Sequence, residues 1–364
     1  MGIVHVPVML EEVRSALLPG PGELRFLDCT LGEGGHAESF LSSWPLIRYT
    51  GIDADPVIQA KARERLAPFA DRMSYRLGFF DEVLEAMLAE VEADELAAPK
   101  GVANPPVPRA TLASHATLAS PATHESRATH GSRRPNRILL DLGVSMFHFV
   151  ESGRGFSLSA RDEALDMRLS PDLPRSAADI VNEEREEELA RLIYEFGEER
   201  LSRRIARAIV EARRQSPIRT SGRLEEIVFS AVPASYRHGR IHPATRTFQA
   251  LRIAVNDELG RAARGLARAA RILAPGGRVA VITFHSLEDR IAKTVFKTLA
   301  GRLDLSLAPA EARPIIEGMD DLSGFVLPFK KPLEPSEAEV ATNPASRSAK
   351  LRLLEKVATG SLAA

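Results

Sequence analysis

The chain has 364 residues, 44% of them hydrophobic and 27% charged, and its 48 basic and 49 acidic side chains give a net charge of −1. This length favours two domains, and the near-neutral charge does not mark the whole molecule as a nucleic-acid-binding protein. No apolar run approaches the roughly 20 residues that cross a bilayer. Residues 1–8 match neither a secretory signal nor a transit peptide, so we expect a cytoplasmic protein with no membrane partner. The single cysteine, Cys29, excludes an intrachain disulfide and a multi-cysteine zinc site, and we expect no metal.

The N-terminal part alternates strand-like and helix-like segments. An apolar run from Leu24 to Cys29 enters a glycine cluster, which is typical of a strand that leads through a loop into a helix. The alternation then repeats and predicts a parallel, doubly wound α/β sheet. The further segments expected are strands at 47–53, 73–77 and 137–141 and helices at 56–66 and 81–91.

Residues 97–136 interrupt this pattern. They are rich in Pro, Ala, Thr, Ser and His, contain a near-repeat starting at Ala110 and again at Ala116, and cannot build a core. We interpret them as a disordered loop inserted between a helix and the next strand. The histidines in this loop are spaced too irregularly to predict a metal site.

Residues 160–241 lack strand signals and predict an inserted all-helical domain, with a charge-rich helical segment at 177–214. From residue 245 the α/β pattern returns with a long helical stretch, whose apolar stripe from Phe248 to Leu273 is expected to pack on the sheet. We therefore assign 1–145 and 245–364 to the α/β domain and 160–241 to a substrate-recognition domain. The remaining segments expected are strands at 278–284, near 325–332 and near 349–355, and a helix at 286–299.

Arginines gather in the helical region. Those from 200 to 214 are opposed only by Glu211, and residues 236–256 contain no acidic side chain. Two interpretations stay open, a solvated helix face or a surface that binds phosphates. The arginines concerned are Arg200, Arg203, Arg204, Arg207, Arg213, Arg214, Arg237, Arg240, Arg246 and Arg252, with His238 and His242 beside the last four.

Two carboxylates and a glycine-rich turn predict a nucleotide-type site. Asp28 ends the first strand and precedes Gly32, Gly34 and Gly35, where backbone must approach a ligand closely. Asp53 ends the next strand, where a carboxylate can accept both hydrogen bonds of a ribose diol. The turn lacks the G-x-G-x-x-G spacing of a nicotinamide-dependent oxidoreductase, the first alternative function, and no Walker lysine follows it. A purely structural interpretation, in which Asp28 caps a helix and Asp53 begins a turn, also stays open.

A third carboxylate, Asp141, ends the strand at 137–141 and opens the segment Asp141-Leu-Gly-Val-Ser145. Open α/β sheets bind their ligands at this carboxyl edge, so we expect catalysis there. The alternative is that Asp141 is another cap at the end of a strand.

These motifs resemble those of the bacterial 16S rRNA (cytosine-N4) methyltransferases that act at the ribosomal decoding site. The resemblance covers nearly the whole chain except 97–136 and 300–324. It implies a Rossmann-like class I fold that uses S-adenosylmethionine, and a 16S rRNA substrate within the small ribosomal subunit. The matching segments are His5-Val-Pro-Val-Met-Leu-Glu-Glu-Val, Gly32-Glu-Gly-Gly-His36, Gly51-Ile-Asp-Ala-Asp-Pro56, Asp141-Leu-Gly-Val-Ser145, Arg154-Gly-Phe-Ser157, Leu165-Asp-Met-Arg168, Gly197-Glu-Glu-Arg200, His242-Pro-Ala-Thr-Arg-Thr-Phe-Gln-Ala-Leu-Arg252, Asn256-Asp-Glu-Leu259, Phe284-His-Ser-Leu-Glu-Asp-Arg290, Asn343-Pro and Arg347-Ser-Ala-Lys-Leu-Arg352.

The resemblance also implies roles for single residues. Gly34, Gly35 and His36 would contact the methionine part of the cofactor, and Asp53 its ribose. Phe80 would face the adenine, and Asp141 would lie beside the transferable methyl group. The family usually has Ser-Pro-Gln where this chain has Met146-Phe-His148, so the cofactor contact of the glutamine falls to His148.

Methyl transfer to a cytosine amino group needs alignment and a proton acceptor, because the nitrogen lone pair is delocalised into the ring. Asp141 is the expected acceptor, and Ser145 and the carbonyls of 142–144 are alternatives. His285 either orients the base or caps a turn, and Phe147 or Phe156 would stack on the flipped base. The second alternative function is a ribosome assembly factor that binds RNA and cofactor without methyl transfer. The sequence leaves the oligomeric state open, a homodimer included.

Overall fold

The computed structural model describes residues 7–18, 24–97, 133–239, 241–319, 322 and 324–358. The loop expected at 97–136 lies, apart from its two ends, outside these residues. In the described part of the chain, no helix has the length and apolar composition needed to span a membrane.

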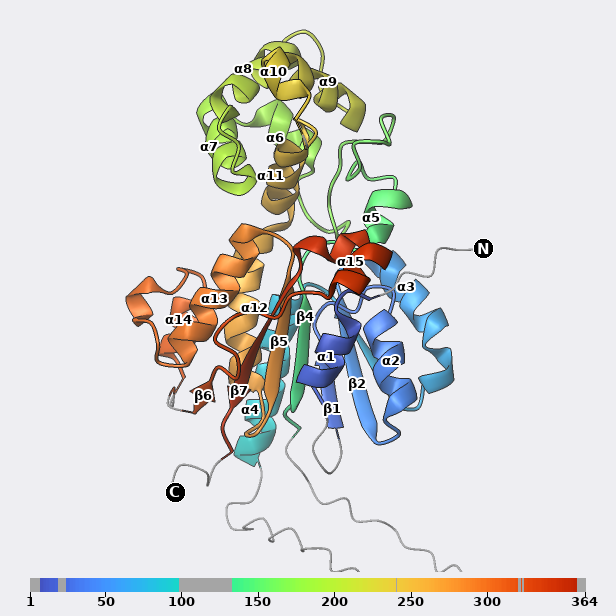
Figure 1. The fold of residues 1–364 in the computed structure, drawn as a ribbon, viewed down its shortest axis with the longest axis vertical. Coiled ribbons are helices and arrows are strands. Elements are labelled where there is room, and N and C mark those ends of the chain that lie inside the picture. The colour runs from blue at the N-terminus through green and yellow to red at the C-terminus, as the bar shows by residue number, and fades with distance from the viewer. Residues whose placement is uncertain are drawn as a thin grey trace, which may run out of the picture.

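A seven-stranded sheet forms the centre of the molecule (Figure 1). Its strand order is β3-β2-β1-β4-β5-β7-β6. The first five strands are parallel, whereas β7 runs antiparallel to β5 and β6 antiparallel to β7. This arrangement confirms the expected Rossmann-like α/β class. The strands are β1 (Leu24–Asp28), β2 (Ile47–Asp53), β3 (Met73–Leu77), β4 (Arg137–Asp141), β5 (Arg278–Thr283), β6 (Phe325–Val326) and β7 (Lys350–Lys356).

Helices cover both faces of the sheet, which explains why the three middle residues of the central strand β4 are all apolar. Ile138 and Leu140 pack into the core beneath α4, α12 and α13, while Leu139 between them packs into the core beneath α1 and α2. A strand covered on both faces needs apolar side chains at every position. The covering helices are α1 (Leu10–Ala16), α2 (Gly35–Ser43), α3 (Pro56–Arg65), α4 (Phe80–Ala97), α12 (Glu258–Ile272) and α13 (Ser286–Leu299).

A second group of helices stands at the end of the molecule beyond the tips of β4 and β5 (Figure 1). It has its own apolar core, to which α6, α7, α8, α9 and α11 contribute. The helices α7 and α11 pack closely, since a Cβ atom added at Gly197 would lie 2.5 Å from the carbonyl oxygen of Arg246. The helices are α6 (Ala177–Glu183), α7 (Glu186–Gly197), α8 (Ser202–Arg213), α9 (Ser221–Ala231), α10 (Ala234–Arg237) and α11 (Thr245–Asn256).

The long helical stretch expected after residue 245 is two helices, which corrects one prediction. Asp257 has a left-handed backbone, with φ of 49°, and separates α11 from α12. Phe248 and Leu251 of α11 therefore pack with the helical group, whereas Leu266 of α12 packs under the sheet. By these contacts α11 belongs with the helical group. The division of the chain into two domains stays a proposal.

The other differences from prediction concern short elements. The strand expected near 325–332 is limited to β6, because Pro328 and Pro332 cannot donate the hydrogen bonds of a longer ladder. A short helix that the sequence did not predict, α5 (Met146–Val150), follows β4. The remaining short elements are α14 (Arg313–Glu317), α15 (Glu337–Thr342) and the 3₁₀ turns η1 (Ala67–Phe69), η2 (Leu305–Leu307) and η3 (Pro344–Ser348).

Candidate functional site

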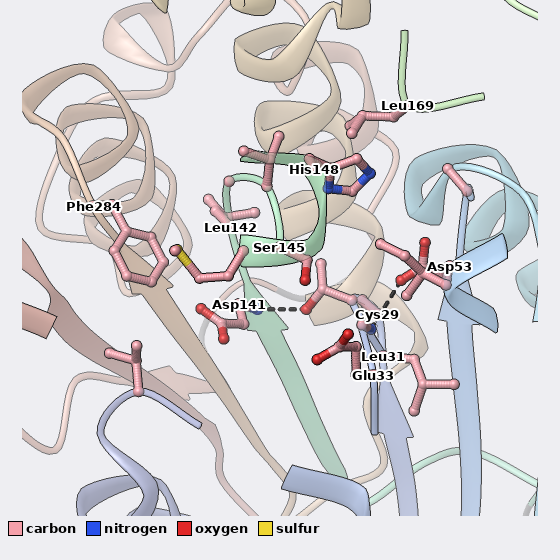
Figure 2. Close-up of a pocket in the computed structure, with 18 of the residues that line it drawn as sticks. Cys29, Leu31, Glu33, Asp53, Asp141, Leu142, Ser145, His148, Leu169 and Phe284 are labelled. Atoms are coloured by element: carbon pink, nitrogen blue, oxygen red, sulfur yellow. Dashed lines mark hydrogen bonds between the residues drawn. The ribbon is translucent and has the colours of Figure 1, made fainter. Parts of the chain in front are cut away.

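A cavity of about 400 Å³ opens at the carboxyl ends of β1, β2, β4 and β5. Its lining brings together most of the predicted site residues: Gly35, His36, Asp53, Phe80, Asp141, Ser145, His148 and His285. Figure 2 shows Asp141 at the tip of β4, with Phe284 on one side of it and Asp53 on the other. The three strands that end at Asp28, Asp53 and Asp141 therefore meet with their carboxyl ends at one edge of the sheet.

The glycine-rich turn wraps tightly under the cavity. Gly32 and Gly34 have left-handed backbones, with φ of 54° and 80°, which glycine adopts without strain. At Gly35, the first residue of α2, an added Cβ atom would lie 2.6 Å from Cγ of Pro7, so the close approach of Pro7 to the start of this helix requires glycine. Gly34 itself lies behind the cavity wall, against Leu66, and is not part of the lining. A direct ligand contact from this turn therefore comes more readily from Gly32 or Gly35 than from Gly34.

Asp28, the first predicted carboxylate, supports the turn from below. It is buried, and it accepts hydrogen bonds from the hydroxyl of Tyr49 (2.8 Å) and the backbone N–H of Thr30 (3.0 Å). Burial raises the pKa of Asp28 to about 6, against the opposing effect of these hydrogen bonds. Asp28 lies outside the cavity lining, so its role is to fix the turn.

His36 and Asp53 lie on the two sides of the turn. His36 is buried, and its Nε2 lies 3.2 Å from the carbonyl oxygen of Val8. The carboxylate of Asp53 accepts one hydrogen bond from the N–H of Gly32 and one from the N–H of Asp55, both at 2.9 Å. Burial raises the pKa of Asp53, and each oxygen keeps a lone pair for a further donor.

Phe80 begins α4 and reaches the cavity because α12 leaves space for its ring. A Cβ atom added at Gly265 of α12 would lie only 2.2 Å from Cε2 of Phe80. Phe79, which also lines the cavity, stacks under the guanidinium of Arg261 at 3.6 Å from its ring centre. The two phenylalanines thus make an apolar wall on the β3 side of the cavity.

Asp141, at the tip of β4, places a buried carboxyl group in the cavity lining. Its Oδ1 is buried and has no hydrogen-bond partner among the described residues. Its backbone N–H donates to Oγ1 of Thr30 at 2.6 Å, which joins the tips of β4 and β1 (Figure 2). Burial, followed by the negative charges of Asp28 and Glu288, raises the pKa of Asp141 well above its usual range. A buried acid with an orphan oxygen in a cavity is a candidate for ligand binding or proton transfer.

The short helix α5 positions Ser145 and His148. Oγ of Ser145 accepts a hydrogen bond from the N–H of Phe147 (3.2 Å) and so caps the helix. His148 is buried, with Nε2 placed 3.2 Å from Oδ2 of Asp55, and its Nδ1 has no partner in the described part of the chain. Because Arg154 also contacts Asp55 (2.9 Å), this carboxylate anchors His148 from behind. Burial opposes ionisation of Asp55, but His148, the N–H of Val57 and Arg154 together lower its pKa.

Asp55 and Arg154 were not predicted as part of the site. Both belong to segments that carried the family resemblance, Gly51–Pro56 and Arg154–Ser157. The sequence did not reveal the ion pair that joins these two segments behind His148. The signal that could have indicated their role is that both are charged residues within segments that match the family.

His285 fits both of its expected interpretations. Glu288 accepts hydrogen bonds from the N–H groups of Phe284 (2.8 Å) and His285 (3.2 Å), which caps the turn from β5 into α13. The ring of His285 lies beside the same carboxylate, with Nε2 3.1 Å from Oε1, and also lines the cavity. Burial alone would raise the pKa of Glu288, but His285, Arg252 and the N–H of Phe284 hold it below its usual value.

The aromatic residues expected to stack on a flipped base lie elsewhere. Phe156 is buried in the core of the helical group, and Phe147 is buried with Nζ of Lys61 4.3 Å from its ring centre. Neither lines the cavity, whereas Phe149 and Phe284 do. The sequence pattern did not separate aromatic residues that fill a core from those that face a ligand.

The arginines singled out in the sequence lie in several settings. Arg252 lies in the cavity lining, and Arg213, Arg237 and Arg246 donate to backbone carbonyls of the helical group. Five arginines are exposed: Arg200, Arg203, Arg204, Arg207 and Arg214. Arg240 lies outside the described residues. The exposed group keeps both interpretations open, a solvated face or a phosphate-binding surface.

Comparison with known proteins identifies the family. A family model described as "MraW methylase family" matches residues 2–357. Proteins named "Ribosomal RNA small subunit methyltransferase H" are similar over almost their whole length. The protein from Treponema denticola is 46% identical over 97% of this chain and 98% of its own, and that from Symbiobacterium thermophilum is 43% identical over 99% of each. The one from Treponema pallidum is 39% identical over 97% of this chain and 93% of its own. The chain belongs to the MraW methylase family.

Proposed function

We propose that this protein uses S-adenosylmethionine to methylate the N4 amino group of a decoding-site cytidine in 16S rRNA, within the small ribosomal subunit. The observation that carries the proposal is the buried oxygen of Asp141, which has no hydrogen-bond partner among the residues that the structure describes and lies in the cavity between Asp53 and Phe284. The names of the relatives support rRNA of the small subunit as the substrate class. We also propose a cytoplasmic location. The cavity is built from one chain, and a homodimer is compatible with it.

The residues present fit the cofactor. Gly32 and Gly35 bring backbone into the cavity lining, and the carboxylates of Asp53 and Asp141 suit a ribose diol and a positively charged sulfonium. When bound, S-adenosylmethionine supplies an electrophilic methyl group. Its methionine part would lie along Gly35 and His36, with Gly34 acting through the turn. Asp53 would hold the ribose, Phe80 the adenine, and His148 would take the place of the family's glutamine.

Asp141 is the proposed proton acceptor. Burial and the nearby carboxylates of Asp28 and Glu288 raise its pKa, which disfavours the charged form. The positive charge of a sulfonium beside it would lower this pKa and favour the carboxylate, the form that accepts a proton. Ser145 is the second candidate, because its hydroxyl lines the same cavity and caps α5. His285 is proposed to orient the base.

The test replaces Asp141 by asparagine, which keeps the shape of the side chain and removes its charge. We expect the variant to keep the fold and most of the cofactor affinity, and to lose methyl transfer by about two orders of magnitude or more. The assay follows labelled methyl transfer to small subunits that lack the modification, with nucleoside mass spectrometry of the product. The exposed Asp304→Asn variant is the matched control. Full activity in Asp141→Asn would remove Asp141 from the mechanism.

The assembly-factor alternative is tested in the same assay. Wild-type protein that binds S-adenosylmethionine but transfers no methyl to any ribosomal substrate would favour that alternative. N-methylation at another cytidine or another atom would retain the enzyme and change its target.

A further inference from the structure

Figure 2 places Phe284 on the side of Asp141 away from Asp53, and we refer to Phe284 with three further lining residues, Gln249 and Arg252 of α11 and His285 after β5, as the second end of the cavity. Arg252 is the fixed cation of this end. Its Nε and Nη2 donate to Oε1 and Oε2 of Glu258, each at 2.8 Å, and its side chain is 15% exposed. Such a two-point pair holds the guanidinium plane in one orientation.

Glu258 uses only one edge of that plane. A guanidinium carries five N–H groups in a fixed fork, and the pair with Glu258 occupies the Nε and Nη2 edge. No hydrogen bond from Nη1 is found within the described part of the chain. The edge formed by Nη1 and the second proton of Nη2 therefore keeps parallel donors for a ligand.

A metal ion is the competing explanation for this cluster. Ligand atoms of Glu258, His285 and Glu288 lie within 4.8 Å of one another. However, both oxygens of Glu258 are engaged by Arg252, and Glu288 holds two backbone N–H groups. A cation would also meet the positive charge of Arg252. The carboxylates are better explained as anchors for the arginine and for the turn after β5.

We propose that Arg252 reads the target base by donating parallel hydrogen bonds to N3 and O2 of cytosine, which directs the adjacent N4 amino group to Asp141. This inference rests on the function proposed above and adds the residue that decides the base. The free edge of Arg252 offers two donors, Asp141 offers an acceptor, and both line one cavity. Cytosine presents the complementary pattern along one edge: acceptors at O2 and N3, and a donor at N4.

The same pattern rejects uracil. Uracil carries N–H at N3, so the arginine donor would meet another donor, and its O4 would meet Asp141 instead of an amino group. An unmatched bidentate pair lowers affinity by about tenfold or more. Arginine is needed here because the single ammonium group of lysine does not form a two-donor fork.

The test measures base preference directly. Decoding-site RNA oligonucleotides carry cytidine, uridine, 3-deazacytidine or 2-pyrimidinone riboside at the target position, and binding is measured with S-adenosylhomocysteine present. For the wild type we expect uridine and 3-deazacytidine, which lack the N3 acceptor, to bind about tenfold or more weakly than cytidine. The 2-pyrimidinone, which keeps N3 and O2 but lacks the amino group, should bind within about threefold of cytidine.

In the Arg252→Lys variant the preference for cytidine over uridine should fall to about twofold or less, with unchanged affinity for S-adenosylhomocysteine. Arg268→Lys is the matched control, because Arg268 is a largely buried arginine paired with Glu85 at 2.9 Å and lies outside the cavity lining. If Arg252→Lys does not fold, Glu258→Gln provides the measurement, since it keeps the arginine but loosens its orientation and should reduce the preference part of the way.

The proposal is overturned if the wild type binds the four oligonucleotides equally, or if Arg252→Lys (Glu258→Gln where the first variant is unfolded) keeps the full wild-type preference. Failure of the proposed function looks different. In that case wild-type protein transfers no methyl to small subunits, whatever its base preference.

Discussion

The carboxylate of Asp53 has a structural role and a proposed role in cofactor binding. It holds the glycine turn through the N–H of Gly32 and the start of the next turn through the N–H of Asp55, and it is proposed to bind the cofactor ribose. The structural interpretation and the binding interpretation are therefore both compatible with its position. The ribose contact adds two hydrogen bonds to a charged group, which are stronger than neutral ones.

Asp53→Ala should weaken S-adenosylmethionine binding by about ten- to a hundredfold, which corresponds to roughly 1.4–2.8 kcal/mol. Calorimetry measures the affinity, and thermal unfolding separates a lost contact from a loosened turn. Asp71→Ala is the control, since Asp71 is 78% exposed. Unchanged affinity in Asp53→Ala would place the ribose elsewhere.

Asp28 makes the stability of the fold depend on pH. Its pKa is raised from 3.8 to about 6, so the folded protein holds this proton more firmly than the unfolded chain does. Stability therefore falls as pH rises from about 3.8 to about 6, and above this window the burial of the charge costs about 3 kcal/mol.

Asp28→Asn should flatten this part of the stability profile and raise the free energy of unfolding at neutral pH. Asparagine can still accept from Thr30 and pair with Tyr49, so the turn is kept. Urea unfolding at several pH values from 4 to 8 provides the measurement, and the two proteins should differ least at the acidic end. An unchanged pH slope would show that Asp28 is not the group responsible.

At the scale of the element, Gly265 of α12 determines where the ring of Phe80 can lie. Gly265 lies in the middle of α12, where glycine costs roughly 1 kcal/mol relative to alanine. It permits the close approach of Phe80, whose Cε2 would lie 2.2 Å from an added Cβ atom. The helix thus gives up local stability at the position that lets the ring reach the cavity.

Gly265→Ala should displace the ring of Phe80 and weaken S-adenosylmethionine binding by about tenfold or more, while α12 itself gains helix propensity. The measurement is cofactor affinity together with the melting temperature. Gly318→Ala is the control, because an added Cβ atom there would meet its nearest neighbour at 3.5 Å. Full affinity in Gly265→Ala would separate Phe80 from cofactor binding.

Elements with a strong periodic pattern could be predicted from sequence, and elements decided by tertiary contacts could not. The strand β4 and the helix α13 begin and end where their apolar patterns and flanking residues indicate. The division between α11 and α12 depends on one left-handed residue, Asp257, which does not interrupt the apolar periodicity. The helix α5 is too short for a periodic signal.

The same limit applies to the site. Asp53 and Asp141 were predicted because parallel strands bring their carboxyl ends to one edge. The pair of Arg252 with Glu258 was not predicted, because it joins two helices through a turn whose geometry the sequence does not reveal. Which phenylalanine faces the cavity depends equally on packing between elements.

At the scale of the whole molecule, the basic and acidic side chains nearly balance in number. The net charge of −1 conceals an exposed set of arginines on and beside α8, in the helical group that stands beyond the tips of β4 and β5 (Figure 1). Binding that involves these arginines would weaken as salt rises, since phosphate contacts release counterions. A phosphate-binding surface made of these arginines would be local, which is why the net charge of the whole chain does not indicate it.

The last prediction concerns the segment between α4 and β4, most of which lies outside the described residues. Its two ends are held next to each other: Arg133 pairs with Asp94 at 2.7 Å, and Arg134 pairs with Glu95 at 2.7 Å. Replacing residues 98–132 by a short glycine-serine linker should therefore leave the melting temperature and the S-adenosylmethionine affinity nearly unchanged, because the closure entropy of a flexible loop varies only slowly with its length. Methyl transfer to small subunits should also persist, since no described residue of the cavity comes from this segment. The control is a linker of matched composition and full length. A loss of cofactor binding with the short linker but not with the long one would mean that the segment sets the geometry of the sheet, and a loss with both would mean that its own sequence contributes to the site.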